Sequence, residues 1–347
     1  AIQLRLGVDG RATSGVTKEL FSYVAGQPTR VRNAGGRTTT AGAFAEATVD
    51  AGDQLTLTAS GRIDHWRIST GHLYESPLTT GATVRNDYAD RSGDEPTARA
   101  GIAFRPTGAI TLRGAGYIGW RLPTLNELYR PFRVGADLTN ANPDLKPETM
   151  RGVEAGADFQ PASGIRLGAT VFWNKLDDAI GNVTVSSTGT SVTRKRQNID
   201  AIRSRGVEVE AEATMSQWHL LASYAYTDAK VHAAGSALAT DGLRPVQTLR
   251  HTASGTLAWA SAPDGFGAAV TARYVAPQFE DDQNSRTLND ALTFDANLRF
   301  PLVQKLSLEL RGENLTDRRI EAGISGAGII ERAAPRTLWV GLRYGGR

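Results

Sequence analysis

The stretch that decides the fold is GYIGWRLPTLNELYRPFRVGADLTNANPDLKPETMRGVE, residues 116–154. Apolar and polar residues alternate up to Trp120 and again from Gly152, and four prolines stand between these points. Proline has no backbone N–H to donate to a sheet, so this interior cannot be a central strand. Thr124 and Glu127 have the spacing of a capping box, which predicts one helical turn over Leu125–Tyr129. The stretch therefore predicts a long, ordered loop held between two strands.

Period-two alternation continues along the rest of the chain and predicts strands throughout. The gaps at 10–37 and 70–95 are predicted as loops, and the gap at 177–202 is predicted to hold a small hairpin around Gly189. Fourteen strands result, at about 2–9, 38–50, 53–69, 97–105, 109–120, 151–160, 164–176, 204–214, 217–229, 250–260, 266–276, 292–300, 305–313 and 335–344.

The connections between these strands alternate strictly, with six short turns and seven long gaps. This asymmetry is typical of outer-membrane barrels, which have short periplasmic turns, long extracellular loops and an even number of strands. A tilted strand of about ten residues spans roughly 26 Å, close to the apolar band of such barrels. The sequence therefore predicts an all-β chain that forms an antiparallel transmembrane β-barrel wall, with both chain ends on the short-turn side.

The two faces of the predicted strands differ in polarity. One phase is apolar and includes Leu112, Val171 and Leu308, so it is predicted to face lipid. The other phase carries acids and bases that would line a wet interior and pair across neighbouring strands, among them Glu208, Glu210, Arg299 and Arg311.

Aromatic residues of the apolar phase gather at both ends of the predicted strands. Two aromatic belts on one face mark two membrane–water interfaces. Trp66 and Trp339 fall on the other phase, and a bulge or a position above the bilayer would account for Trp66. The predicted belts are Trp120, Trp173, Tyr224, Tyr226 and Tyr274 at the long-loop ends, and Phe104, Phe159, Trp218, Trp259, Phe266, Phe300 and Tyr344 at the short-turn ends.

Five segments of the chain resemble the TonB-dependent receptors of Gram-negative outer membranes. They are RLPTLNELY (121–129), NPDLKPE (142–148), RGVE (151–154), ENLTD (313–317) and APRTLWVGLRY (334–344). The resemblance implies a barrel of about 22 strands around an N-terminal plug that carries a TonB-binding segment. Residues 1–347 would then form the C-terminal part of the barrel, with about eight strands and the plug upstream.

The same resemblance implies a function and a location. Receptors of this family sit in the outer membrane among lipid and lipopolysaccharide, and their extracellular loops bind a scarce nutrient. The ligand is usually a ferric siderophore, and sometimes cobalamin, haem or a saccharide. The TonB complex then acts on the plug to drive import.

Composition and motifs exclude several other classes. The net charge is +3, from 39 basic and 36 acidic residues, so no nucleic-acid partner is indicated. The chain has no cysteine and no run approaching 18 apolar residues, which excludes disulfides and a transmembrane helix. The five histidines lack the spacing of a zinc site, and no nucleophile elbow is present. We predict no enzyme activity, no cofactor and no metal. The acidic loop 280–282 could be a weak calcium site but is better interpreted as solvated.

Two groups of cations interleaved with aromatic residues are the predicted ligand-binding residues. Such groups suit an anionic, ring-bearing ligand through ion pairing and cation–π contact. The alternative is that these cations pair with lipopolysaccharide phosphates. Pro123, Pro143, Pro147 and Glu148 are predicted to shape the loop and not to touch ligand. The candidate residues are Tyr129, Arg130, Phe132 and Arg133 in the central loop, and Arg194 and Arg196 in the loop 177–202.

Two other architectures remain open. A passive channel of fourteen strands would close by pairing residues 1–9 with residues 335–344. A soluble β-sandwich used for adhesion or binding would stack two sheets, although it does not explain the belts or the alternation of short and long connections.

Overall fold

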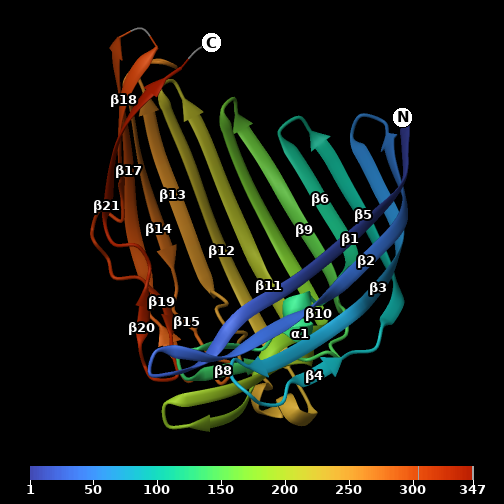
Figure 1. Cartoon of the computed structure of the whole chain (residues 1–347). Coiled ribbons are helices and arrows are strands. Elements are labelled where there is room, and N and C mark those ends of the chain that lie inside the picture. The colour runs from blue at the N-terminus through green and yellow to red at the C-terminus, as the bar shows by residue number, and fades with distance from the viewer. Residues whose placement is uncertain (304, 346–347) are drawn as a thin grey trace.

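Fourteen long antiparallel strands form one curved sheet with the shape of an incomplete cylinder (Figure 1). The computed structural model describes residues 1–303 and 305–345. The wall strands are β1 (Ile2–Val24), β2 (Gln27–Ala51), β3 (Leu55–Pro77), β5 (Arg91–Thr107), β6 (Ile110–Arg121), β9 (Glu148–Ala162), β10 (Ile165–Thr188), β11 (Ser191–Met215), β12 (Trp218–His232), β13 (His251–Ala260), β14 (Gly267–Val275), β17 (Ala291–Val303), β18 (Leu306–Glu313) and β21 (Thr337–Tyr344). The number and order of the predicted strands are confirmed.

Short elements occupy the long connections. Neither helix in the described ranges is long and apolar enough to cross a membrane. These elements are β4 (Val84–Asp87), α1 (Leu125–Tyr129), β7 (Phe132–Val134), β8 (Asp137–Asn140), the 3-10 helix η1 (Gly235–Thr240), β15 (Gln278–Phe279), β16 (Thr287–Leu288), β19 (Glu321–Ile324) and β20 (Ile330–Arg332).

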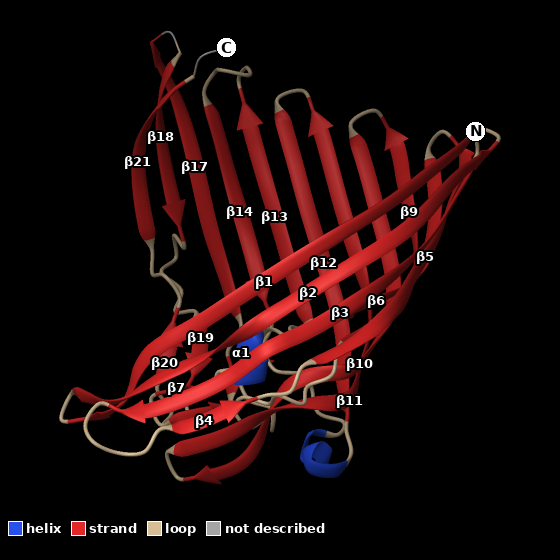
Figure 2. Ribbon diagram, turned by 45° about the vertical axis from the view of Figure 1, so that its right-hand side comes forward, coloured by secondary structure: helices blue, strands red, loops and turns tan. Residues whose placement is uncertain are grey.

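The short turns lie together at one end of the sheet and the larger loops at the other (Figure 2). Both chain ends lie at the short-turn end, as predicted (Figure 1). Backbone hydrogen bonds tie each of them to the adjacent turn, from Asp50 N to Ala1 O at 2.8 Å and from Gly345 N to Lys305 O at 2.9 Å.

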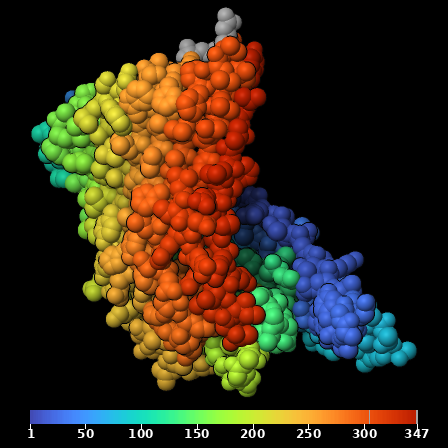
Figure 3. All heavy atoms as spheres, turned by 90° about the vertical axis from the view of Figure 1, so that its left-hand side faces the viewer, coloured from blue at the N-terminus to red at the C-terminus, as the bar shows by residue number. Residues whose placement is uncertain are grey.

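The sheet does not close on itself. Among the described residues β1 pairs with β2 alone and β21 pairs with β18 alone. Figure 3 shows the red C-terminal strands and the blue N-terminal strands diverging on this side of the molecule. The pairing of residues 1–9 with residues 335–344, which the closed-channel alternative requires, is therefore wrong. The stacked sheets of a sandwich are also wrong, because the wall strands form one continuous layer.

Several strands are longer than predicted. The gap 10–37 is wrong as a loop, because β1 and β2 pair in a single register from Ile2 with Val49 to Val24 with Gln27. Its glycines serve close packing within the sheet. A Cβ on Gly35 would overlap the carbonyl oxygen of Gly15, and one on Gly36 would lie 3.1 Å from the Tyr129 ring. The predicted hairpin around Gly189 is confirmed, with Thr188 paired to Ser191.

Polar pairs line the face of the sheet that α1 contacts, which we call the lumen face. Arg113 donates to Asp158 at 3.0 Å and to Thr170 at 2.7 Å across neighbouring strands. Two predicted cross-strand pairs are wrong. Arg299 donates to turn carbonyls at Pro263 and Gly265, and Arg311 pairs with Glu313 on its own strand. Arg299 lies at the level of the turn, and Arg311 has the Glu313 carboxylate two residues away on the same face.

The aromatic belt at the short-turn end is continuous from β12 to β17. Ring centroids lie 6.5 Å apart for Trp218 and Trp259, 5.7 Å for Trp259 and Phe266, and 5.0 Å for Phe266 and Phe300. At the long-loop end Trp173 and Tyr224 are exposed on the opposite face from the lumen, as predicted.

Two tryptophans do not follow the predicted scheme. Trp120 is not in the outer belt, because its indole packs against the apolar cluster under the central loop and donates to Asp64 at 3.1 Å. Trp66 is not at a bulge, because it pairs in register with Thr40 and Gly93, and its side chain packs on the lumen side. It is 7% exposed within the same cluster. A buried apolar core thus lies at the long-loop end, beneath the loop 122–147.

Candidate functional site at the long-loop end

The central loop begins with the predicted helical turn, α1. Thr124 Oγ1 accepts from the Glu127 N–H at 3.2 Å, and Glu127 Oε2 accepts from the Thr124 N–H at 2.7 Å. This reciprocal pair is the capping box that the sequence predicts. Burial alone would raise the pKa of Glu127, but hydrogen bonds from Arg121 and Thr124 outweigh it and hold the pKa below its usual value.

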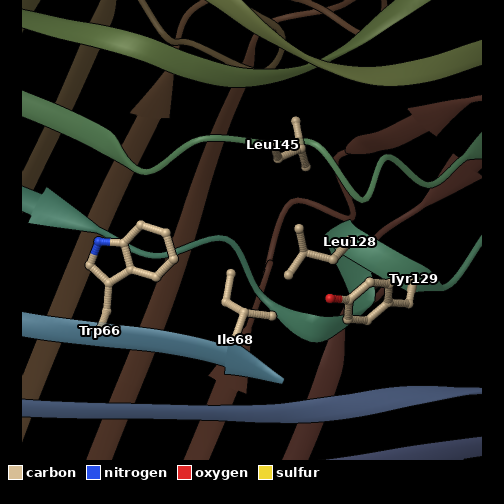
Figure 4. Packing of buried hydrophobic residues seen from close by; sticks show 5 residues of the cluster. All are labelled: Trp66, Ile68, Leu128, Tyr129 and Leu145. Carbon is tan, nitrogen blue, oxygen red and sulfur yellow. The ribbon is translucent and has the colours of Figure 1, made fainter. Parts of the chain in front are cut away.

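An apolar cluster anchors this turn to the wall. Figure 4 shows Trp66 and Ile68 from β3 to the left of Leu128 and Tyr129 from α1, with Leu145 from the later part of the loop above them. Ile68, Leu128 and Leu145 have no exposed surface, and Tyr129 is 2% exposed. Tyr129 also stacks on Tyr88, with ring centroids 5.0 Å apart. The loop is therefore anchored to the wall by packing like that of a protein core.

Side chains from the surrounding strands satisfy the loop's backbone. Arg196 on β11 donates to the carbonyls of Asn126, at 2.5 Å, and Arg130, at 3.0 Å. Asn142 returns a bond from its Nδ2 to the Arg196 carbonyl at 2.9 Å. Arg91 donates to the Leu145 carbonyl at 2.7 Å. Arginines on the wall strands thus donate hydrogen bonds to the backbone carbonyls of the loop.

The segment 142–148 is a structural clamp. Asn198 accepts from the Lys146 N–H at 2.9 Å and donates to the Lys146 carbonyl at 3.1 Å. Glu148 is 6% exposed, accepts from the Ile180 N–H at 2.6 Å and pairs with Arg121. The prediction that Glu148 shapes the loop is consistent with these contacts.

An ion-pair network joins the loop to the long β1–β2 hairpin. Glu19 accepts from Arg32 at 2.9 Å and from Arg130 at 2.8 Å. Arg32 also pairs with Glu75 at 2.7 Å and donates to the Pro131 carbonyl at 2.9 Å. The network holds three strands and the end of α1 in one arrangement.

A cavity of about 620 Å³ lies between the loops at the long-loop end. Hairpin β7–β8, the ends of β10 and β11 and three later loops form its walls, so its cations and acids come from distant parts of the chain. Arg244 lies over the Phe279 ring at 5.4 Å, and burial lowers the pKa of its guanidinium. Its polar lining includes Asp137, Arg194, Arg244, Gln247, Glu280 and Asp282.

The acidic loop beside the cavity is folded around its own carboxylates. Asp281 is 4% exposed and accepts from the Ser285 and Arg286 N–H groups at 2.9 and 2.8 Å and from the Ser285 hydroxyl at 2.6 Å. Asp282 accepts from the Thr184 N–H at 2.7 Å. The interpretation of this loop as solvated is therefore wrong, because its carboxylates close a turn and bind a neighbouring strand.

Comparison with known proteins decides the family. The model of the family described as TonB dependent receptor-like, beta-barrel, matches residues 2–315. The chain belongs to this family. The vitamin B12 transporter BtuB of Vibrio vulnificus is 24% identical over 278 residues, which cover 79% of this chain and 41% of the transporter. The ferrioxamine receptor of Yersinia enterocolitica is 22% identical over 302 residues, covering 84% and 38% of the two chains.

Solved structures of receptors have the same fold as this TonB-dependent receptor barrel. The ferric yersiniabactin uptake receptor FyuA from Yersinia pestis superposes with a TM-score of 0.78 at 16% identity, over 99% of this chain and 51% of that one. The siderophore receptor PiuA from Acinetobacter baumannii gives 0.68 at 17% identity, over 92% and 44%. The chain thus spans about half the length of these structures and about two fifths of the curated relatives.

Family membership confirms three predictions. The chain is an all-β wall of a TonB-dependent receptor barrel, and it is located in the Gram-negative outer membrane. The matched relatives are named as transporters and receptors, which confirms the prediction that the chain is not an enzyme.

The structure places the six predicted ligand residues of this receptor barrel in different surroundings. Tyr129 is buried in the apolar cluster, Arg196 is buried against the loop carbonyls, and Arg130 pairs with Glu19. Arg133 is exposed on β7 and donates to the Ala136 carbonyl at 3.3 Å. Only two of the six line the cavity, Phe132 and Arg194.

Sequence reasoning missed the role of other polar residues of the cavity. Arg244 and Gln247 come from a loop that the alternation leaves undescribed, and Glu280 comes from the acidic loop, which was considered only as a calcium site. Gln247 donates to Glu280 at 2.9 Å, a contact between loops more than 30 residues apart. No local motif marks these residues, although the cation–aromatic combination of Arg244 and Phe279 has the same character as the groups that were chosen.

Proposed function

We propose that the whole protein is a TonB-dependent receptor that imports a scarce nutrient, and that the nutrient is a ferric siderophore. The main support for this proposal is the cavity at the long-loop end. It is large enough for a small molecule, and its wall contains Arg194, Arg244 and the ring of Phe132. The Arg244 guanidinium lies over the Phe279 ring, which is outside the lining. Cations beside aromatic rings suit an anionic, ring-bearing iron chelate. The names of the ferrioxamine and yersiniabactin receptors agree with this class of ligand.

In this proposal the six predicted residues divide into two roles. Phe132 and Arg194 contact the ligand inside the cavity, and Arg133 meets it at the rim. Tyr129, Arg130 and Arg196 hold the loop that presents them, through the stacking, ion-pair and carbonyl contacts described above.

We also propose that further strands and a plug complete the barrel. The unpaired outer edges of β1 and β21 support this, since a lone sheet edge in a membrane leaves backbone groups unsatisfied. About eight more strands would close the wall. The TonB complex would act through the plug, and the outer face would contact lipid and lipopolysaccharide. Amide hydrogen exchange in the whole protein should be slow along β1 and β21, and fast exchange at both edges contradicts closure.

Ligand titration of the purified full-length protein tests the proposed substrate. Tryptophan fluorescence should respond to one or more ferric siderophores. The Arg194→Gln variant should bind about tenfold or more weakly, because it loses a charge-assisted contact. Lys195→Gln is the matched control, since Lys195 is the exposed neighbour outside the cavity lining.

The titration has a specific alternative outcome. Two of the curated relatives are named as vitamin B12 transporters, so cobalamin is the second candidate ligand. A response to cobalamin with none to any ferric chelate contradicts the siderophore assignment. An unchanged dissociation constant for Arg194→Gln removes Arg194 from the ligand contacts.

A further inference from the structure

Asp137 lies where three segments of the chain meet at the cavity. It is the first residue of β8 and is 9% exposed. Its carboxylate accepts from the Val192 N–H on β11 at 3.1 Å and from the Gly326 N–H at 3.0 Å. Arg194 Nη1 lies 3.5 Å from the same carboxylate. One buried carboxylate thus binds a wall strand, a cation of the cavity and a loop that is 189 residues further along the chain.

The hairpin β19–β20 forms one wall of the cavity without belonging to the sheet of the barrel. Its two strands make a separate small sheet at the long-loop end (Figures 1 and 2), and residues 323–325 line the cavity. The Ile324 carbonyl accepts from Arg286 at 3.2 Å. Within the described ranges, residues 325–329 at the tip make one hydrogen bond outside their own hairpin, and Asp137 accepts it.

The contact between Asp137 and Gly326 leaves no room for a side chain on the hairpin tip. A Cβ on Gly326 would overlap the Asp137 carboxylate. Gly328 in the same tip has a φ of +77°, a conformation that favours glycine, whereas Gly326 is not among the glycines with positive φ. Close approach to the carboxylate, and not backbone conformation, therefore accounts for the glycine at residue 326.

We propose that Asp137 is a positioning residue for ligand binding, which fastens the tip of hairpin β19–β20 over the cavity and holds Arg194 beside it. The connection with ligand rests on the proposed function, whereas the fastening rests on the contacts of Asp137 alone. A hydrogen bond to an ionised acceptor is about twice as strong as one between neutral groups, so a single carboxylate can hold the tip. The tip then closes this side of the cavity, and breaking its bond to Asp137 opens it.

Cysteine labelling in a cysteine-free background of the full-length protein tests the proposal. Thr139 lines the cavity two residues from Asp137 and is 3% exposed, so a Thr139→Cys variant should react slowly with a water-soluble maleimide. Adding Gly326→Ala should raise the labelling rate about tenfold or more, because the tip loses a hydrogen bond to a charged group.

Gly119→Ala is the matched control for Gly326→Ala. A Cβ on Gly119 would meet no atom within 4 Å, and this residue is outside the cavity lining. Adding Gly119→Ala to Thr139→Cys should leave the labelling rate unchanged. Equal labelling rates for the two glycine variants overturn the proposal.

A double-mutant cycle shows whether the effect passes through Asp137. Asp137→Ala removes both the acceptor of the hydrogen bond and the atoms that a Cβ at residue 326 would overlap. It should raise the labelling rate by itself. Adding Gly326→Ala to Asp137→Ala should then change the rate by less than about twofold, since the two substitutions break the same contact. If Gly326→Ala has the same effect with and without Asp137, the proposal is overturned.

Amide exchange in the ligand-free parent protein needs no variant and stands if a variant does not fold. The Gly326 N–H is bonded to Asp137, whereas the Ala327 N–H has no acceptor within the described residues. After correction for intrinsic rates, Gly326 should exchange about tenfold or more slowly than Ala327. Equal exchange of the two amides overturns the proposal. Labelling and exchange are both measured without ligand, so failure of this proposal is distinguishable from failure of the siderophore titration.

Discussion

Gly71 on β3 lies directly beneath the ring of Tyr129, and a Cβ at this position would overlap that ring. Close packing of this kind explains why glycine stands in a strand interior, where it otherwise weakens the sheet. We expect Gly71→Ala to lower the free energy of unfolding by about 1–3 kcal/mol, since the Tyr129 ring must move. Urea unfolding of the full-length protein in lipid vesicles measures this change.

The control for this prediction is on the same strand. A Cβ on Gly61 would meet no atom within 4 Å. Gly61→Ala should therefore leave the stability unchanged or raise it slightly, because alanine lowers the entropy of the unfolded chain. Equal destabilisation by both substitutions would show that Tyr129 does not pack on β3 as described.

Glu127 makes the stability of α1 depend on pH. Its pKa in the folded protein is lowered from the usual 4.5, so its contribution is fully present above pH 4.5 and is lost as pH falls through the folded value. We expect Glu127→Gln to reduce this acid-dependent part of the loop's stability. Glutamine keeps the capping-box contact to Thr124 but cannot form the ion pair with Arg121. Amide exchange of Leu128 and Tyr129, compared between about pH 6 and about pH 3, should change less in the variant than in the parent. An identical pH dependence would contradict the assignment.

At the scale of elements, the loop 122–147 behaves as a folded unit held by the strands around it. Arg196 bridges two carbonyls of this loop and lies 5.1 Å from the centroid of the Phe132 ring. Arg196→Ala should remove the only recorded side-chain donor to the Arg130 carbonyl and one of two donors to the Asn126 carbonyl, which keeps the Arg130 N–H, at a cost of about 1–3 kcal/mol. Exchange of the loop amides should then become faster while the wall strands keep their protection.

Arg133→Ala provides the comparison for Arg196→Ala. Arg133 is exposed, and its recorded hydrogen bond is to Ala136 on the same hairpin. Its removal should change loop exchange by less than about threefold, as expected for a surface site. If both variants exchange alike, Arg196 does not hold the loop.

The sequence predicted elements well where one physical signal dominated. Alternation gave the fourteen wall strands, and the spacing of Thr124 and Glu127 gave α1. The prediction of a loop at 10–37 failed because glycine occurs both in turns and where two segments pack closely. Only the position of Tyr129 in the fold shows that close packing is the reason here. The prediction that Trp120 belongs to the outer belt failed because alternation assigns each residue to a face of the sheet. It does not show that an indole packs under a neighbouring loop.

The candidate site was less accessible to prediction. Phe132 and Arg194 were found from local composition, but Arg244 and Glu280 join them only because loops far apart in sequence meet in space. Arg196 was predicted to bind ligand because of its charge, but its guanidinium donates to loop carbonyls. A cation in a loop therefore has two competing uses, to hold backbone or to bind ligand, and burial distinguishes them.

At the scale of the whole molecule, the two faces of the wall differ in polarity. Lumen-face residues such as Arg113 and Asp158 pair across strands, while Val171 and Trp173 on the opposite face are about half exposed in the isolated wall. In the outer membrane this outer face meets lipid, and the lumen face meets water and the plug that we propose. The aromatic belts then fix the depth of the wall in the bilayer.

Spin-label accessibility along β10 tests this central claim most directly. The chain contains no cysteine, so single cysteines at residues 169–173 give labels at known positions within it. In the full-length protein in lipid bilayers, labels at Ala169, Val171 and Trp173 should be relaxed by oxygen, which is soluble in lipid. Labels at Thr170 and Phe172 should be protected from oxygen and more accessible to a water-soluble nickel complex. Equal accessibility of the two sets, or the reverse pattern, would contradict a wall with lipid on one face and water on the other.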